Sequence, residues 1–209
     1  MSIAQQTVDG FLRALASDAP TPGGGAVAAL SGATGAALIS MVCNLTIGRK
    51  GYEEAEERMH AILADAETAR TAFLELADRD ATAFDGVMAA FKMPKETDAE
   101  KAVRSQAIQQ GYEAAAEVPL EIARRAAELM ELARETTEMG NANAASDGAC
   151  AAQALSASVW SATYNVDINA AALKDQAKAT ALRDEVSALL ASAHALLDAT
   201  DAAFGSRLG

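Results

Sequence analysis

The chain has 209 residues, of which 51% are hydrophobic and 4% aromatic, and its formal net charge is −12 at pH 7. This length suffices for one domain with a sizeable core, and a composition rich in Ala, Leu, Val and Met but poor in aromatic residues favours helices. The acidic balance repels nucleic acid and anionic membrane surfaces, so we expect neither as a partner. Residues 1–209 are therefore expected to form a single all-α domain.

Apolar spacing predicts a series of helices along the chain, with no alternating strand pattern. Their approximate bounds are residues 3–17, 22–47, 52–91, 97–117, 119–139, 148–166 and 173–204. Thr21 can cap the second helix with Pro22 at its first position, and Thr97 opens a capping-box pattern. Pro119 is expected to kink the chain or restart it into a new helix.

Two segments, 19–48 and 148–166, contain no charged side chain. Helices that are apolar or small all round belong at the centre of a bundle, so we expect a single-domain helical bundle with two buried charge-free central helices. Small residues recur at i, i+4 in both, which permits close helix approach. The first segment is also long enough to cross a membrane, but its scattered Ser, Thr and Asn residues favour a buried helix of a soluble protein.

Other sequence features restrict the class of protein. Cys43 and Cys150 both lie in the uncharged segments, and we expect buried, reduced thiols in a cytoplasmic protein. The N-terminus shows no signal-peptide pattern. His60 and His194 fit no metal-ligand spacing, so no metal site is expected, and phosphate-loop, dinucleotide and nucleophile-elbow motifs are absent from the sequence.

The triple glycine Gly23-Gly24-Gly25 and Asp80 are the first candidate functional features. Each glycine costs roughly 0.8–1 kcal/mol against alanine in a helix interior, so three together indicate a close approach to the backbone, by another helix or by a ligand. Asp80 lies on the apolar side of the long third helix, between Phe73 and Phe84. Burial would raise its pKa and suit it to acid–base chemistry, while a structural carboxylate with a polar partner is the alternative.

Polar residues near the helix ends supply further candidates, each with a structural alternative. Asp147 follows Asn141, Asn143 and Ser146, and all four are typical of caps and turns. Arg49 and Lys50 can complete a helix C-terminus or receive an anionic ligand. Two amides one helical turn apart can bind a ligand or satisfy each other and the backbone; these are Asn165 and Asn169.

Several motifs occur together in one order. They are Pro-Thr-Pro-Gly-Gly-Gly at 20–25, Leu45-Thr46-x-Gly48-x-Lys50, Asp80-x-x-Ala83-Phe84, Met93-Pro94-Lys95, Gly140-Asn141-x-Asn143-x-x-Ser146-Asp147 and Asn165-Val166-x-Ile168-Asn169. In this combination the chain closely resembles the formiminotetrahydrofolate cyclodeaminase/methenyltetrahydrofolate cyclohydrolase family over essentially its whole length. The resemblance implies an all-helical, usually dimeric, folate-binding enzyme of one-carbon metabolism, so a homodimer is expected.

Two departures from the family pattern bear on the site. Gly51 stands where the family often has a further lysine, which weakens the case for a three-residue basic patch. The loop carries Ala142, Ala144 and Ala145 where bulkier residues are common, so its packing is expected to differ in detail.

The family resemblance leaves two reactions open. A cyclodeaminase closes 5-formiminotetrahydrofolate to 5,10-methenyltetrahydrofolate with release of ammonia, and a cyclohydrolase hydrates the methenyl bridge to give 10-formyltetrahydrofolate. The sequence carries no formiminotransferase domain and looks most like the short stand-alone cyclohydrolases, so the second reaction is favoured. A non-catalytic helical protein, in which these residues only cap and pack, is the alternative of another class.

The resemblance assigns roles to the candidate residues. One of Asp80 and Asp147 would deprotonate the attacking water, and the other would orient it or stabilise the developing cationic nitrogen. The helix start at Thr21, Gly23, Gly24 and Gly25 would offer backbone N–H groups to the pterin or glutamate, and Lys50 would bind the glutamate tail. The residues expected to contact the pterin and amide are Asn44, Asn141, Asn143, Ser146, Asn165 and Asn169. No cofactor beyond the tetrahydrofolate substrate is expected.

Overall fold

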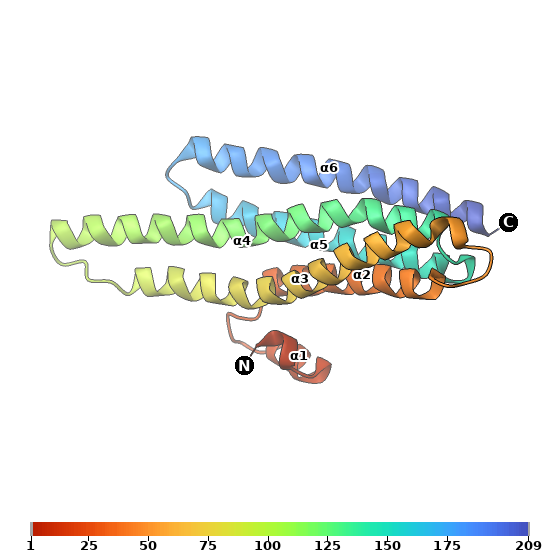
Figure 1. Cartoon of the computed structure of the whole chain (residues 1–209). Helices are drawn as coiled ribbons and strands as arrows, with labels where there is room; N and C mark the ends of the chain where they lie inside the picture. Colours follow the sequence, from red (N-terminus) through yellow and green to blue (C-terminus); the bar gives the residue numbers. More distant parts are fainter. Residues whose placement is uncertain (1, 209) are drawn as a thin grey trace.

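The computed structural model describes residues 2–208, and that part of the chain folds into a single all-α domain (Figure 1). The helices are α1 (Val8–Leu15), α2 (Gly24–Thr46), α3 (Glu56–Phe91), α4 (Asp98–Met139), α5 (Ala145–Ala171) and α6 (Gln176–Arg207). Three short 3₁₀ turns, Ile3–Gln5, Glu53–Ala55 and Ala142–Ala144, precede α1, α3 and α5. The all-α prediction is confirmed.

The packing of α2 and α5 organises the bundle. α2 contacts α3, α4 and α5, while α5 contacts α2, α4 and α6. The two helices are antiparallel, because Gly24 at the start of α2 lies beside Asn165 near the end of α5. The α3–α4 hairpin extends beyond the other helices, and the short α1 lies outside the bundle on the side of α3 (Figure 1).

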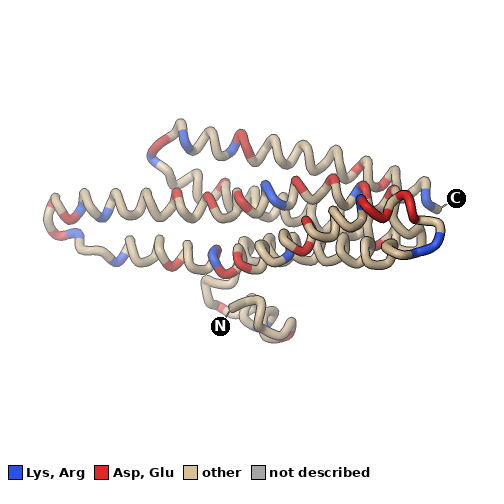
Figure 2. Tube along the Cα trace, viewed as in Figure 1, with Lys and Arg blue, Asp and Glu red and all other residues tan. Residues whose placement is uncertain are grey.

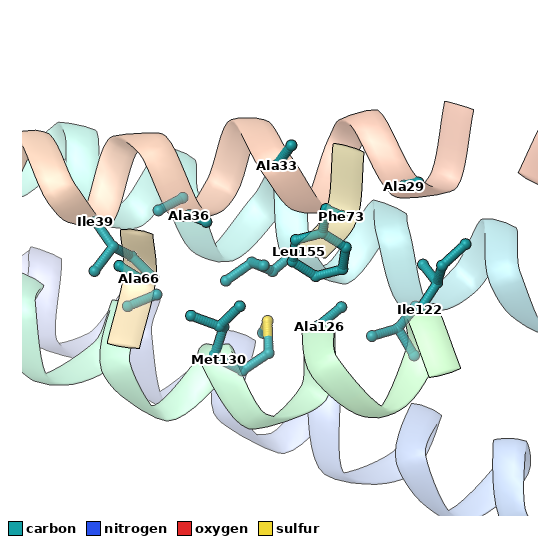
Figure 3. Packing of buried hydrophobic residues seen from close by; sticks show 14 of the residues in the cluster. Ala29, Ala33, Ala36, Ile39, Ala66, Phe73, Ile122, Ala126, Met130 and Leu155 are labelled. Carbon is teal, nitrogen blue, oxygen red and sulfur yellow. The ribbon is translucent and has the colours of Figure 1, made fainter. Parts of the chain in front are cut away.

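Small residues let α2 approach its neighbours closely. A Cβ atom on Gly32 would lie 2.6 Å from the Phe73 ring of α3, and one on Gly35 would lie 2.6 Å from Leu155 of α5. Figure 3 shows Phe73 and Leu155 together in the core beneath the alanines of α2. Glycine at these two positions is therefore required by helix packing and needs no ligand.

The uncharged α2 is mostly a core helix. By length and composition it could cross a membrane, a test that buried helices of soluble proteins also pass, and 61% of its most apolar window is buried inside the bundle. Cys43 lies in this buried part, and burial raises the pKa of its thiol to about 11. Cys150 is exposed, so the expectation that both thiols are buried is wrong for Cys150, which faces outward from α5.

Several helix ends differ by a few residues from the predicted ranges, and two of the differences bear on the site. α2 begins at Gly24 with Gly23 as its N-cap and no side-chain cap, so Thr21 lies outside the helix. α4 runs unbroken through Pro119. Proline has no N–H and leaves the carbonyl four residues earlier, that of Ala115, without its helical donor. The Asn169 side chain of α5 replaces that donor, since its Nδ2 donates to the Ala115 carbonyl at 3.1 Å.

The start of α4 agrees with its sequence signature. The Thr97 hydroxyl accepts from the Glu100 N–H at 3.2 Å, and the Glu100 carboxylate accepts from the Thr97 N–H at 2.8 Å. This reciprocal pair satisfies two helix donors and fixes where α4 begins after the α3–α4 turn. The predicted capping box is confirmed.

Candidate active site

A cavity of about 540 Å³ opens at the N-terminus of α2, between α3, α4 and α5. Its polar lining includes seven residues that the sequence indicated, namely Thr21, Gly23, Gly24, Gly25, Asp80, Asn165 and Asn169. The remaining lining is largely apolar and includes Phe84, Val87, Met88, Phe91, Tyr112 and Ile168. A concave apolar site with a few converging polar groups is typical of small-molecule binding.

Asp80 of α3 and Gly25 of α2 meet at this cavity. A Cβ atom on Gly25 would overlap the Asp80 carboxylate. Gly25 is buried, so a side chain at this position could be accommodated only if the Asp80 carboxylate moved away. The close approach that the triple glycine indicated is therefore, at Gly25, the approach of a carboxylate from a neighbouring helix.

Two opposing effects act on the Asp80 carboxyl. Burial raises its pKa above the ordinary value, and the backbone N–H of Ala26 at the start of α2 lowers it. The first effect is the larger. Among residues 2–208, Asp80 is the one charged side chain that lines the cavity. A desolvated carboxylate without a paired cation is well suited to accept a proton from water.

The two asparagines of α5 have structural bonds and a free acceptor. Asn169 Nδ2 donates to Ala115 and also to the Asn165 carbonyl at 2.8 Å, while Asn165 Nδ2 donates to the Ser161 carbonyl at 2.8 Å. Both N–H groups of Asn169 Nδ2 are thus engaged and one of the two on Asn165 Nδ2, while both amide oxygens can accept from a ligand donor. The structural and the ligand-binding interpretations of these residues are thus compatible.

The apolar half of the cavity contains residues that sequence analysis did not assign to the site. Phe91 and Tyr112 pack edge to face with ring centroids 6.2 Å apart, and the Arg104 guanidinium lies 5.6 Å from the Phe91 centroid. On α3, the residues at 80, 84, 87, 88 and 91 share one helix face. This spacing is visible in the sequence, but apolar residues three and four apart are equally typical of a helix packed into a core.

The other predicted site residues lie at the opposite end of the molecule. They are Asn44, Lys50, Asn141, Asn143, Ser146 and Asp147, at or beyond the end of α2 and around the start of α5. At roughly 1.5 Å per residue, Gly25 and Asn44 are about 28 Å apart along α2, and Asp147 and Asn165 about 27 Å apart along α5. Within one copy of the chain, Asp80 and Asp147 therefore do not line the same cavity.

At that end, Asn141 follows α4 and forms hydrogen bonds with the end of α2 and with the 3₁₀ turn that precedes α5. It is buried, its Nδ2 donates to the Leu45 carbonyl at 3.1 Å, and its Oδ1 accepts from the Asn143 N–H at 3.1 Å. Its own N–H donates to the Thr46 hydroxyl at 2.9 Å. These bonds give Asn141 a structural role at the junction of α2 and α5.

Lys50 and Asp147 have fewer structural constraints. Lys50 is exposed in a turn between Gly48 and Gly51, whose φ angles are 70° and 90°. Asp147 is half-buried in the first turn of α5, where a carboxylate complements the helix N-terminus. Both side chains are therefore available at the surface of this end.

The chain is thus an all-α protein with a cavity of small-molecule size at the start of its glycine-rich helix α2. Residues 7–188 match the family described as Formiminotransferase-cyclodeaminase, and the chain belongs to that family. The family resemblance inferred from the sequence motifs is confirmed.

Individual relatives cover the chain almost completely. It is 46% identical over 191 residues to a methenyltetrahydrofolate cyclohydrolase of Methylorubrum extorquens, covering 91% of this chain and 92% of that protein. It is 36% identical to the formimidoyltransferase-cyclodeaminase of Sus scrofa, covering 92% of this chain but 36% of the longer relative. A crystal structure of a formiminotetrahydrofolate cyclodeaminase from Thermotoga maritima superposes with a TM-score of 0.88 at 30% identity, covering 99% of this chain and 100% of that one.

Proposed function

We propose that this chain is a methenyltetrahydrofolate cyclohydrolase, which hydrates 5,10-methenyltetrahydrofolate to 10-formyltetrahydrofolate. The observation that carries the proposal is the Asp80 carboxylate, which faces a largely apolar cavity and has no cationic neighbour in the lining formed by residues 2–208. The cyclohydrolase of Methylorubrum extorquens, similar along nearly its whole length, supports the choice of reaction.

In the proposed mechanism Asp80 is the general base. The substrate's methenyl carbon is cationic, and an ionised carboxylate in an apolar site attracts it. Asp80 removes a proton from the attacking water as its oxygen bonds to this carbon, which gives a neutral tetrahedral intermediate. Asp80 then returns the proton to N5 as the bond between carbon and N5 breaks. The hydroxyl proton leaves to solvent, and the formyl group remains on N10.

The cavity supplies complementary binding groups for such a substrate. The amide oxygens of Asn165 and Asn169 accept from the N–H groups of the pterin. The apolar wall at Phe84, Phe91 and Tyr112 packs against the flat p-aminobenzoyl ring. The α2 N-terminus favours partial negative charge near the reacting carbon.

A cyclodeaminase is the second candidate, favoured by the close superposition on the Thermotoga maritima enzyme. Both reactions pass through a tetrahedral carbon between N5 and N10, so the same cavity can serve either. Purified protein is tested in two assays: loss of the near-ultraviolet absorbance of methenyltetrahydrofolate, and ammonia release from 5-formiminotetrahydrofolate. Accelerated hydrolysis supports the first proposal, fast ammonia release supports the second, and a protein inactive in both is a non-catalytic member of the family.

We further propose that the enzyme acts as a homodimer in the cytoplasm and needs no metal or cofactor besides the folate. The proposed reaction consumes only water besides the folate, which supports the absence of a further cofactor. Both cysteines are free thiols, which is compatible with the reducing cytoplasm. The net charge of −12 opposes binding to nucleic acid or anionic membranes. In this assembly α2 and α5 are the central pair, and their outward sides are the surfaces that a second copy covers.

A further inference from the structure

One face of α4 is fastened to the connection between α5 and α6. Ser105, Gln109 and Glu113 lie on this face at i, i+4 spacing. Lys174 Nζ donates to the Ser105 hydroxyl at 2.6 Å, and Lys178 Nζ lies 2.6 Å from Glu113 Oε2. Figure 2 shows charges of both signs in the connection between α5 and α6. These two contacts join exposed side chains, so they contribute little to the position of the connection.

The contact made by Gln109 differs because it engages the backbone. The Gln109 Nε2 donates to the Ala172 carbonyl at 3.2 Å, and its Oε1 accepts from the Lys174 N–H at 2.6 Å. Ala172 is the C-cap of α5, where backbone groups lack helical partners. Both halves of the half-buried amide are thus used, and they hold the backbone in one position relative to α4.

The end of α5 that Gln109 holds is one wall of the cavity. Asn165, Ile168, Asn169 and Ala172 line it, and their spacing of three and four places them on one face of α5. Gln109 lies outside the lining formed by residues 2–208. Its side chain therefore acts on this wall from behind, through the backbone, without contact with a ligand.

The same stretch of α4 also packs against the opposite wall. A Cβ atom on Gly111 would lie 3.3 Å from the Cα of Val87 on α3, so the two helices are in close contact there. Val87 lines the cavity on the helix that carries Asp80, and Tyr112 lines it from α4. Between Gln109 and Tyr112, α4 thus joins the wall with the carboxylate to the wall with the two amides.

A second bond between α4 and α5 leaves Gln109 with a distinct effect. Asn169 Nδ2 donates to the Ala115 carbonyl, six residues beyond Gln109. At roughly 1.5 Å per residue, Ala115 and Gln109 are about 9 Å apart along α4. One bond fixes a single point of α5 and lets its last turn pivot, whereas two bonds at this separation also fix its direction.

Resting on the function proposed above, we infer that Gln109 is a positioning residue for substrate binding. It holds the last turn of α5 at the distance from α3 at which the amide oxygens of Asn165 and Asn169 meet the N–H groups of the pterin. Asp80 is held separately, by its contact with the start of α2. Loss of Gln109 should therefore weaken substrate binding and leave proton transfer nearly intact.

Replacement by methionine tests the inference, because methionine has nearly the same length and forms neither hydrogen bond. Gln109→Met is expected to raise KM for 5,10-methenyltetrahydrofolate about tenfold, as for the loss of one ligand hydrogen bond. The kcat is expected to stay within about twofold of wild type, since binding groups that act equally on substrate and transition state change KM alone. An unchanged KM, or a fall in kcat at unchanged KM, overturns the inference.

Thr97→Ala is the matched control for the stability of α4. It removes the capping box at the start of the same helix and leaves the end of α5 untouched. Both variants are expected to lower Tm, but Thr97→Ala should keep the wild-type KM. If Thr97→Ala raises KM as much as Gln109→Met does, the change belongs to helix stability, and the positioning role of Gln109 is wrong.

Equilibrium binding gives a second readout that requires no turnover. The probe is 5-formyltetrahydrofolate, a stable folate with a one-carbon group on N5, and titration calorimetry gives its Kd. Gln109→Met should bind it about tenfold more weakly than wild type. Equal Kd values overturn the inference. A wild type that binds this folate without hydrolysing methenyltetrahydrofolate overturns the proposed reaction alone, because the two Kd values still decide the role of Gln109. A wild type that does neither overturns both.

Discussion

Gly25 and Gly86 are glycines inside helices with opposite surroundings. A Cβ on Gly25 would overlap Asp80, whereas one on Gly86 would meet no atom within 4 Å. We expect Gly86→Ala to stabilise the protein by about 0.4–1 kcal/mol and to leave activity unchanged. Gly25→Ala is expected to displace the carboxylate and abolish most activity. Denaturation and kinetic assays check both, and an active Gly25→Ala enzyme would contradict the role given to this contact.

Asp80 is expected to dominate the chemistry. Asp80→Asn removes the base while keeping nearly the same shape, and kcat should fall by roughly 10²–10⁴-fold. Asp85→Asn, on an exposed position of the same helix, is the matched control and should behave as wild type. Single-turnover absorbance measurements give the rates. Equal activity in the two variants would remove Asp80 from the mechanism.

Burial of Asp80 also predicts a pH dependence. Because its pKa is raised from 3.8, kcat/KM should decline as pH falls through this higher pKa, before an ordinary aspartate would protonate. The Asp80→Asn variant should lack that limb of the profile. A wild-type profile that stays flat down to the ordinary aspartate range would contradict the assignment.

The free energy of unfolding is expected to change with pH in the opposite direction to activity. The folded protein favours the protonated form of Asp80, so this residue costs no stability below its unfolded-state pKa and becomes unfavourable as pH rises through its folded-state pKa. At neutral pH, Asp80→Asn should therefore raise Tm, by roughly 2–4 °C for each kcal/mol recovered. Calorimetry at neutral pH and below pH 4 checks this, since the gain should vanish in acid.

The residue scale also shows what sequence reasoning could reach. Asp80 was identifiable because a charge stood in an apolar helical seam. Tyr112 was not, since its place beside Phe91 depends on how α4 packs on α3 rather than on any local pattern. The sequence around Asn169 could not reveal its hydrogen bond to the Ala115 carbonyl, because the two residues are 54 positions apart.

Among the helices, α4 depends on a specific hydrogen bond from its neighbour α5. Its passage through Pro119 depends on Asn169 of α5, which occupies the carbonyl of Ala115. Asn169→Ala should cost about 1–3 kcal/mol, because a polar group shielded by the bundle loses its partner. In a Pro119→Ala background the helix regains its own donor, and the cost of Asn169→Ala should shrink. Chemical denaturation of the four proteins gives the coupling, and additive effects would contradict the compensation.

Helix positions were largely predictable, and the exceptions have tertiary causes. Apolar spacing and the Thr97 capping box indicate the bounds of α3 and the start of α4 from local chemistry alone. The unbroken α4 was not predictable, since proline interrupts a helix unless another element replaces the lost bond. Thr21 fails as a cap because the helix begins at Gly24, where the backbone must admit Asp80 and Asn165.

For the whole molecule, composition predicted the all-α fold, and the motifs predicted the family. The distance between the two candidate aspartates was beyond sequence reasoning. It follows from the antiparallel register of α2 and α5, which places Gly24 beside Asn165 and the end of α2 beside Asn141. Residues that form one motif set can thus lie at two ends of one chain.

A homodimer in which the second copy covers the exposed side of α2 at Ala37 should have a thermal stability that depends on protein concentration. For a native dimer that unfolds to monomers, mass action raises Tm as protein concentration increases. Ala37→Glu should remove this dependence, while Ala195→Glu, at an exposed position of α6, should preserve it. Calorimetry across a hundredfold range of protein concentration measures Tm, and light scattering measures the mass of the protein in solution. A wild-type Tm independent of concentration would contradict a dimer in equilibrium with its unfolded chains.

The bond between Asn169 and the Ala115 carbonyl also has an evolutionary consequence. A chain that acquires proline at position 119 without an amide at 169 leaves a carbonyl unpaired, and a chain that loses the proline no longer needs the amide for its fold. Substitutions at the two positions should therefore be correlated across descendants of a common ancestor. An asparagine that is retained after the proline is lost would instead indicate selection for ligand binding. The substitutions at these two positions therefore distinguish the structural role of Asn169 from its proposed role in ligand binding.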